Sequence, residues 1–190
     1  MHNRDHIRQW ARDRRRALTP QQQQHTAGAL AEQALAQPSI MQARTLALYL
    51  ANDGEADPAI LMQALHAAGK QVLLPVLHPF SSGYLLFQSW HPGMAMTRNR
   101  FNIAEPPLSA ATLVPVKHID VVFTPLVAFD EQGNRLGMGG GFYDRSLAAF
   151  QGLTVGLAHD CQQYPALPAA AWDKPLDMIL TASQVKRFRY

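Results

Sequence analysis

The sequence has one cysteine, few charged residues and no long apolar run. Because Cys161 is the only cysteine, the chain can form neither an internal disulfide nor a zinc site built from four cysteines. This favours a reducing compartment, and we expect a cytoplasmic protein. No apolar run approaches the roughly 18 residues that span a bilayer, and the N-terminal charges are not followed by the apolar segment of a signal peptide.

Charged residues make up 16% of the chain, against about 25% in an average domain. Hydrophobic residues make up 47%, which excludes a disordered chain and predicts one domain over residues 1–190. Residues 1–16 hold six arginines and two aspartates, a net charge of +4 within a total of +3. The remaining chain is therefore close to neutral, which argues against a surface that binds nucleic acid uniformly. We expect a monomer that binds neither nucleic acid nor membrane.

Helical and strand-like segments alternate along the chain at intervals of about 30 residues. This order predicts an α/β fold with a largely parallel sheet, preceded by an arginine-rich N-terminal helix. Thr19 followed by Pro20 is typical of a capped helix start, and Gly69 of a helix end. The expected helices are 3–17, 20–36, 58–69 and 142–150, and the expected strands are 44–50, 71–77, 84–90, 120–129, 153–159 and 178–181.

A glycine-rich stretch follows the strand expected at 120–129 and precedes a helix. Glycines at such a junction let backbone N–H groups approach an anion, and the following helix adds its positive end. Arg135 could add a fixed charge to a phosphate, and Asp144 could hold a magnesium ion. The stretch lacks the lysine of a P-loop and has no partner that completes a dinucleotide fingerprint. A plain turn capped by glycines remains the alternative.

Residues 125–144, PLVAFDEQGNRLGMGGGFYD, resemble the signature of the 5-formyltetrahydrofolate cyclo-ligase family, with Phe142 in place of the usual first tyrosine. Shorter motifs in matching order extend the resemblance over nearly the whole chain: Tyr49-Leu50 with Gly54-Glu55, the LLP at 73–75, FNIAEP at 101–106 and VGLA at 155–158. The resemblance implies a three-layer α/β domain. It also implies ATP- and magnesium-dependent conversion of 5-formyltetrahydrofolate to 5,10-methenyltetrahydrofolate, by phosphorylation of the formyl oxygen and ring closure by N10.

The resemblance also implies roles for individual residues. Arg135 and Tyr143 would be catalytic, and Asp144 and Asp177 would hold magnesium, with Asp173 as an alternative to Asp177. Met138 and Gly140 stand where family members often have basic residues. The other implied contacts are ATP binding by Arg4, Arg8, Arg135, Gly137, Met138, Gly139, Gly140, Gly141 and Tyr143, and folate binding by Leu50, Glu55, Phe101, Met138 and Phe142.

Two other functions stay open from the sequence. A non-catalytic folate- or nucleotide-binding protein on the same scaffold would bind ligands without turnover. An RNA-associated module would use the arginine-rich arm and bind RNA with strong salt dependence. His159 and Asp160 beside Cys161 could suggest a nucleophile, but nothing accompanies them that would stabilise an oxyanion, and we expect a structural cysteine. Lys186, Arg187 and Arg189 are expected to form a solvated basic tip.

Overall fold

The computed structural model describes residues 3–168 and 173–188, and its centre is a seven-stranded sheet. The five inner strands run parallel, and β3 and β11 pair antiparallel at the two edges. This confirms the α/β fold with a largely parallel sheet. In spatial order the strands are β11 (Val185–Arg187), β10 (Met178–Leu180), β9 (Leu153–Leu157), β6 (Val121–Thr124), β1 (Thr45–Ala47), β2 (Gln71–Leu77) and β3 (Leu85–Ser89).

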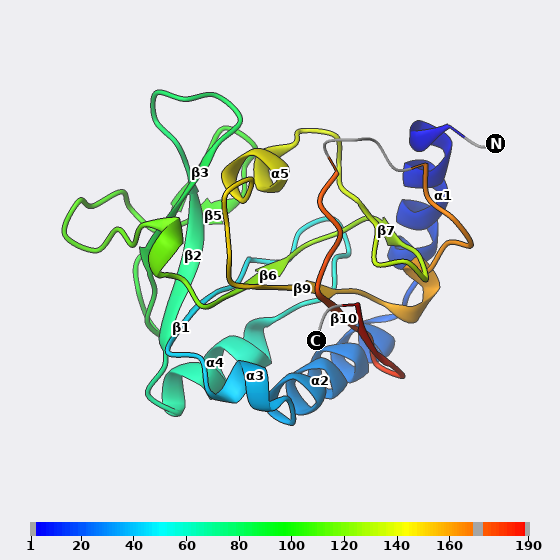
Figure 1. The fold of residues 1–190 in the computed structure, drawn as a ribbon, viewed down its shortest axis with the longest axis horizontal. Helices are drawn as coiled ribbons and strands as arrows, with labels where there is room; N and C mark the ends of the chain where they lie inside the picture. Colours follow the sequence, from blue (N-terminus) through cyan, green and yellow to red (C-terminus); the bar gives the residue numbers. More distant parts are fainter. Residues whose placement is uncertain (1–2, 169–172, 189–190) are drawn as a thin grey trace.

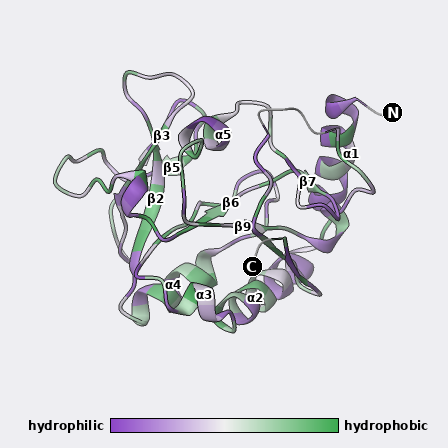
Figure 2. Cartoon of the chain, in the orientation of Figure 1, coloured by the Kyte–Doolittle hydropathy of each residue, from purple (hydrophilic) through white to green (hydrophobic). Residues whose placement is uncertain are grey.

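Helices cover both faces of the sheet (Figure 1). On one face lie α2 (Pro20–Leu35), α3 (Pro38–Met41) and α4 (Ala59–Ala67), and on the other lies α5 (Phe142–Ser146). Alternate strand residues point to opposite faces, so Leu46 packs with the α2–α4 side and Ala47 with the α5 side. Helix α1 (Arg4–Arg16) stands at one end of the sheet, beside β7 (Ala128–Phe129), and is mainly hydrophilic where α4 is mainly apolar (Figure 2).

Local sequence signals explain where several elements begin and end. The Thr19 hydroxyl accepts the backbone N–H of Gln22 at 3.2 Å, and the Gln22 side chain accepts the Thr19 N–H at 2.8 Å. This reciprocal cap confirms the predicted start of α2. Gly69 has φ +75° just beyond α4, as expected of a residue that ends a helix. Among the described residues, no helix is long and apolar enough to cross a membrane.

Two expectations about local structure were wrong. The strand expected at 120–129 breaks after Thr124, because Pro125 has no N–H, and its end becomes β7, which pairs with β8 (Arg135–Leu136). The helix expected at 142–150 ends at Ser146. Four short elements were not predicted: the two strands of a small hairpin between β3 and β6, a 3-10 turn that follows the hairpin, and a second 3-10 turn after β9. Their bounds are β4 (Thr97–Arg98), β5 (Ala104–Glu105), η1 (Val116–His118) and η2 (Asp160–Gln162).

The basic C-terminal segment was expected to be a solvated tip; its described part forms the edge strand β11, in which Arg187 is exposed as expected and Lys186 is half-buried. Lys186 pairs with Glu131, and the Arg187 guanidinium donates to the side-chain oxygen of Gln37. Antiparallel pairing with β10 aligns Lys186 with Ile179. Local sequence is a poor guide here because edge strands carry polar and charged side chains. Arg189, the third basic residue of the expected tip, lies outside the described residues.

Candidate active site

A cavity of about 1210 Å³ opens beyond the carboxyl ends of β1, β2 and β6. Ligands bind at this edge of open parallel sheets, because the loops leaving the strands converge there. Helix α1, the loop after β1, the β7–β8 hairpin, the glycine loop and α5 all contribute to its walls. The residues with implied roles that line it are Arg4, Arg8, Leu50, Glu55, Phe101, Arg135, Gly137, Met138, Gly139, Gly140, Gly141, Phe142, Tyr143 and Asp144.

Arg135 and Asp144 form an ion pair inside this cavity. The Arg135 guanidinium donates to a carboxylate oxygen of Asp144 and is almost fully buried. β8 supplies the arginine and α5 the aspartate, so the glycine loop between them brings the two charges together. Gly141 begins α5 at φ +64°, a conformation that favours glycine. The pair thus presents one fixed positive and one fixed negative group to a ligand.

Tyr143 lies beside this pair, with its ring centroid 6.0 Å from the Arg135 guanidinium carbon. The hydroxyl is buried and has no hydrogen-bond partner among the residues described. Burial, assisted by the negative charge of Glu55, raises the pKa of Tyr143 well above its ordinary value. The hydroxyl therefore keeps its proton at neutral pH and can act as a hydrogen-bond donor.

Arg4 and Arg8 reach the cavity from α1, one helical turn apart. The Nε of Arg8 donates to the carbonyl of Gly137 at 2.9 Å, which holds the helix against the glycine loop. A Cβ built on Gly139, whose φ is +100°, would lie 3.5 Å from the Arg8 guanidinium. Arg4 pairs with Asp173 and donates through Nε to the carbonyl of Pro168 at 3.2 Å. Both positive charges are therefore held in place at the cavity wall.

Glu55 lines the cavity and directly follows a turn at Asp53 and Gly54. Its Oε2 accepts the backbone N–H of Asn52 at 3.0 Å, which closes the loop on itself. Burial raises the pKa of Glu55 to about 7, although the bond from Asn52 and the charge of Arg15 oppose the rise. Its protonation state therefore changes near neutral pH.

Aromatic side chains line the cavity mouth. Phe101 and Phe142 meet edge to face, with centroids 5.8 Å apart. Phe101 is 51% exposed and Met138 is also 51% exposed, so both keep apolar surface free to cover a flat ring. Leu50 lines the same cavity from the loop after β1. The structure thus brings together these four residues of the expected folate contacts in one cavity.

The two aspartates assigned to magnesium are placed differently. Asp177 is buried, and its Oδ2 accepts the backbone N–H of Thr154 at 2.8 Å and the Thr154 hydroxyl at 2.7 Å. It is not among the described residues that line the cavity, whereas the alternative, Asp173, lines it. The described residues include no group of three or more histidine, cysteine or acidic side chains arranged to hold a metal. Magnesium usually takes one or two carboxylates together with substrate phosphates, and Asp144 fits that pattern.

Sequence reasoning assigned no role in the site to three basic side chains that line the cavity: Arg15, Arg145 and Lys174. Arg145 donates through Nε to the carbonyl of Gly83 at 3.0 Å and also contacts the Gly140 carbonyl. Lys174 donates through Nζ to the carbonyl of Phe150 at 2.7 Å. Both line the cavity, and they bring positive charge near the loop where Met138 carries none. The place of Arg145 next to Asp144 in the motif was a usable signal, but Lys174 had none.

The histidine near Cys161 does not form a nucleophile–base pair with it. His159 is buried, and its ring nitrogens contact the Thr26 hydroxyl at 3.3 Å and the Gly54 carbonyl at 3.2 Å. Burial raises the pKa of the Cys161 thiol, which favours its unreactive protonated form. The expectation of a structural cysteine agrees with these contacts.

Comparisons with known proteins agree on one family. The model of the 5-formyltetrahydrofolate cyclo-ligase family matches residues 1–182. The chain is 50% identical over 177 residues to the 5-formyltetrahydrofolate cyclo-ligase of Escherichia coli strain K12, covering 92% of this chain and 97% of that protein. It is 46% identical over 180 residues to that of Haemophilus influenzae, covering 93% and 96%. The NMR structure of Aquifex aeolicus 5,10-methenyltetrahydrofolate synthetase superimposes with a TM-score of 0.86 at 28% identity, covering 98% of this chain and 93% of that one.

Proposed function

Because this chain belongs to the 5-formyltetrahydrofolate cyclo-ligase family, we propose that it converts 5-formyltetrahydrofolate to 5,10-methenyltetrahydrofolate and consumes magnesium ATP. Membership of this family implies that the chain is an enzyme and that ATP is its co-substrate. The proposal adds the magnesium requirement, the order of bond changes and the roles of individual residues. The observation that carries it is the single cavity in which the glycine loop, the Arg135–Asp144 pair and Glu55 all lie.

The chemistry requires activation of a poor leaving group. The formyl group on N5 is an amide-like carbonyl, and its oxygen does not leave unaided. Transfer of the γ-phosphoryl group of ATP to that oxygen breaks the β–γ phosphate linkage and releases ADP. N10 then attacks the formyl carbon, the carbon–oxygen bond breaks, and phosphate leaves with the oxygen while N10 loses its proton. The protein has to align these groups and neutralise charge, and it need not supply a covalent nucleophile.

The phosphate end of the cavity has the groups that this transfer needs. Backbone N–H groups of the glycine loop, with Arg8 and Arg135, would bind the phosphates of ATP and stabilise the charge that builds on the transferring group. Arg4 would add charge from the same helix face. Asp144 would hold the magnesium ion, which neutralises phosphate charge when bound. Asp173 fits the position of a second carboxylate better than Asp177, because it lines the cavity.

Another set of lining residues, which we call the folate wall, has the groups expected for a folate. The Glu55 carboxylate can accept the paired N–H groups on the donor edge of a pterin. Phe101 and Phe142 offer aromatic surface for the ring, and Leu50 adds apolar contact. Tyr143 lines the cavity beside Arg135, and its buried hydroxyl could donate to the formyl oxygen or to the transferring phosphoryl group.

A non-catalytic folate- or nucleotide-binding protein was the alternative from the sequence. The high identity to cyclo-ligases over nearly the whole chain disfavours it. The arginine-rich helix also disfavours the RNA-associated module, because Arg15 is fully buried and Arg4, Arg8 and Arg12 are paired with carboxylates. An array of arginines held in this way is a poor surface for nucleic acid.

The test is the near-ultraviolet absorbance of the conjugated methenyl product. Purified protein is mixed with 5-formyltetrahydrofolate, and ATP and magnesium are left out one at a time. Absorbance that grows only when both are present supports the proposal. Folate binding by titration without product under any condition would instead support the non-catalytic binder.

A further inference from the structure

Asp53 is the meeting point of three arginines from the last turns of α1. Its Oδ2 accepts Arg12 Nε at 2.9 Å and Arg15 Nη2 at 3.0 Å, and its Oδ1 accepts Arg16 Nε at 2.5 Å. Its backbone carbonyl accepts Arg15 Nε at 2.8 Å. Although burial opposes it, these bonds hold the pKa of Asp53 below its ordinary value. The carboxylate thus stays charged and fixes the end of the helix to the loop that follows β1.

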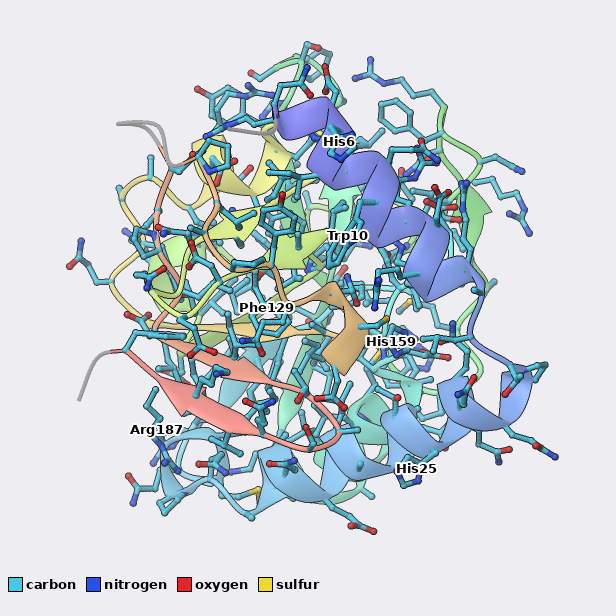
Figure 3. The ribbon with its side chains drawn as sticks, turned by 90° about the vertical axis from the view of Figure 1, so that its right-hand side faces the viewer. His6, Trp10, His25, Phe129, His159 and Arg187 are labelled. Atoms are coloured by element: carbon cyan, nitrogen blue, oxygen red, sulfur yellow. The ribbon has the colours of Figure 1, made fainter. Side chains whose placement is uncertain are left out.

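The contacts around Asp53 extend to the rest of the scaffold. Arg15 is fully buried and also donates to the carbonyl of Leu126, in the segment that leads to the β7–β8 hairpin. The carbonyl of Gly54 contacts His159 Nε2 at 3.2 Å. His159 lies between the C-terminal end of α1 and helix α2 (Figure 3). The turn at Asp53 and Gly54 is therefore held from several sides.

This turn is also conformationally demanding. Asp53 has φ +52° and Gly54 has φ +74°, both in the left-handed region. Aspartate and asparagine tolerate this region better than most residues with a side chain, but it still costs energy. The bonds from the three arginines offset that cost. Without these bonds, this conformation of the loop would be less stable.

The two sides of the contact carry residues for different substrates. Arg8 lies seven residues before Arg15 on the same face of α1, about 10 Å along the helix, and it lines the phosphate end of the cavity. Glu55 lies two residues after Asp53 and lines the folate wall. The Asp53 carboxylate consequently joins the helix that would hold ATP to the loop that would hold the pterin.

We propose that Asp53 is a positioning residue that locks the arginine face of α1 to the Glu55 loop and so makes ATP and folate bind cooperatively. The inference rests on the proposed function. Because the same contact joins the two binding surfaces, a change that one substrate causes in α1 or in the Glu55 loop is passed to the other surface. Asp53 itself lines the cavity, but both of its carboxylate oxygens accept hydrogen bonds from arginines of α1. It acts through Arg8 on one side and Glu55 on the other.

The test measures the dissociation constant of 5-formyltetrahydrofolate by calorimetric titration, with and without saturating magnesium and β,γ-imido ATP. In the native protein the nucleotide analogue should tighten folate binding by about fivefold or more. In Asp53→Asn, the ratio of the dissociation constants without and with the nucleotide analogue should fall close to one. Asparagine keeps the size and the tolerance of positive φ but removes the charge. Glu131→Gln, which breaks the exposed pair with Lys186, is the matched control and should keep the native ratio.

The same ratio in the native protein and in Asp53→Asn would overturn the inference, because cooperativity would then arise from direct contact between the two ligands. A native ratio of one would also overturn it. If Asp53→Asn does not fold by circular dichroism, Arg12→Gln replaces it, since Arg12 is 28% exposed and provides only one of the bonds. A full native ratio in Arg12→Gln would then count against the inference. Absence of methenyl product from the native enzyme would instead refute the proposed function, and the binding ratios would still be readable.

Discussion

Arg135 donates a hydrogen bond to Asp144 across the glycine loop that separates them in the chain. The arginine is almost fully buried, while the aspartate keeps part of its surface open to the cavity. Each charge satisfies the other before ligands arrive, so neither has to be reoriented at the moment of reaction. Charges that are held in place in this way stabilise a transition state more than the same charges on mobile side chains.

Replacement of Asp144 should abolish turnover and leave the fold intact. We expect kcat of Asp144→Ala to fall by about 100-fold or more, the size seen when one charge-stabilising group is removed from an active site. Steady-state formation of the methenyl product measures this, and circular dichroism checks the fold. Glu131→Gln removes a carboxylate that is not among the described residues lining the cavity and should keep native kinetics. Full activity of Asp144→Ala with magnesium would refute the assignment of Asp144 to the metal.

Replacement of Arg8 should weaken ATP more than folate. Arg8→Ala removes a positive charge held at the glycine loop, and we expect the KM for ATP to rise by about tenfold or more, as for loss of a charge-assisted contact. Arg14→Ala is the matched control, because Arg14 is exposed on the same helix and packs on Trp10. Equal rises in the KM for ATP and for folate would point to a purely structural role for α1.

The raised pKa of Glu55 makes folate binding depend on pH. Glu55 loses its proton near pH 7, and the carboxylate is the form that accepts N–H groups of a pterin. Affinity for 5-formyltetrahydrofolate should therefore increase as the pH rises from 6 to 8. Glu55→Gln should bind folate more weakly and show a flatter profile across this range. Parallel profiles for the two proteins, measured by titration, would mean that another group controls binding.

The same group links stability to pH in the opposite direction. Between its unfolded pKa of 4.5 and its folded pKa of about 7, Glu55 binds a proton more tightly in the folded state. Its contribution to stability is complete below pH 4.5 and is lost as the pH rises to about 7, with a change on the order of 3 kcal/mol at most. Urea unfolding should thus find Glu55→Gln more stable than the native protein at pH 8. A less stable variant at pH 8 would contradict this account of the burial cost.

Replacement by alanine of two glycines that do not line the cavity should change the stability of the protein in opposite directions. A Cβ on Gly152 would lie 2.4 Å from the backbone oxygen of Asp120, which cannot move aside, so Gly152→Ala should destabilise the fold by about 2 kcal/mol or more. A Cβ on Gly28, inside α2, would meet nothing within 4 Å. Gly28→Ala should therefore stabilise the protein by about 0.5–1 kcal/mol. Denaturant midpoints of the two variants would show whether they move in opposite directions.

The alternation of strands and helices predicted the parallel sheet, because that order depends on local patterns. The resemblance, carried by the glycine-rich stretch and the shorter motifs, supplied most of the residues that line the cavity. The sequence could not predict that Asp53 binds three arginines, since that contact joins residues 37 to 41 positions apart. The placement of Asp177 was equally out of reach, because its bonds to Thr154 depend on how β9 and β10 align. β11 was not predicted because two of its three residues are charged, and charged residues do not indicate a strand from local sequence.

The most direct test of the account follows the formyl oxygen itself. 5-Formyltetrahydrofolate labelled with oxygen-18 in the formyl group is converted by the purified protein with magnesium ATP, and the released phosphate is analysed by mass spectrometry. Phosphorylation of the formyl oxygen predicts one oxygen-18 atom in each phosphate released. Unlabelled phosphate, with the label recovered in water, would contradict phosphoryl transfer to the formyl group and with it the roles assigned to Arg8, Arg135 and Asp144.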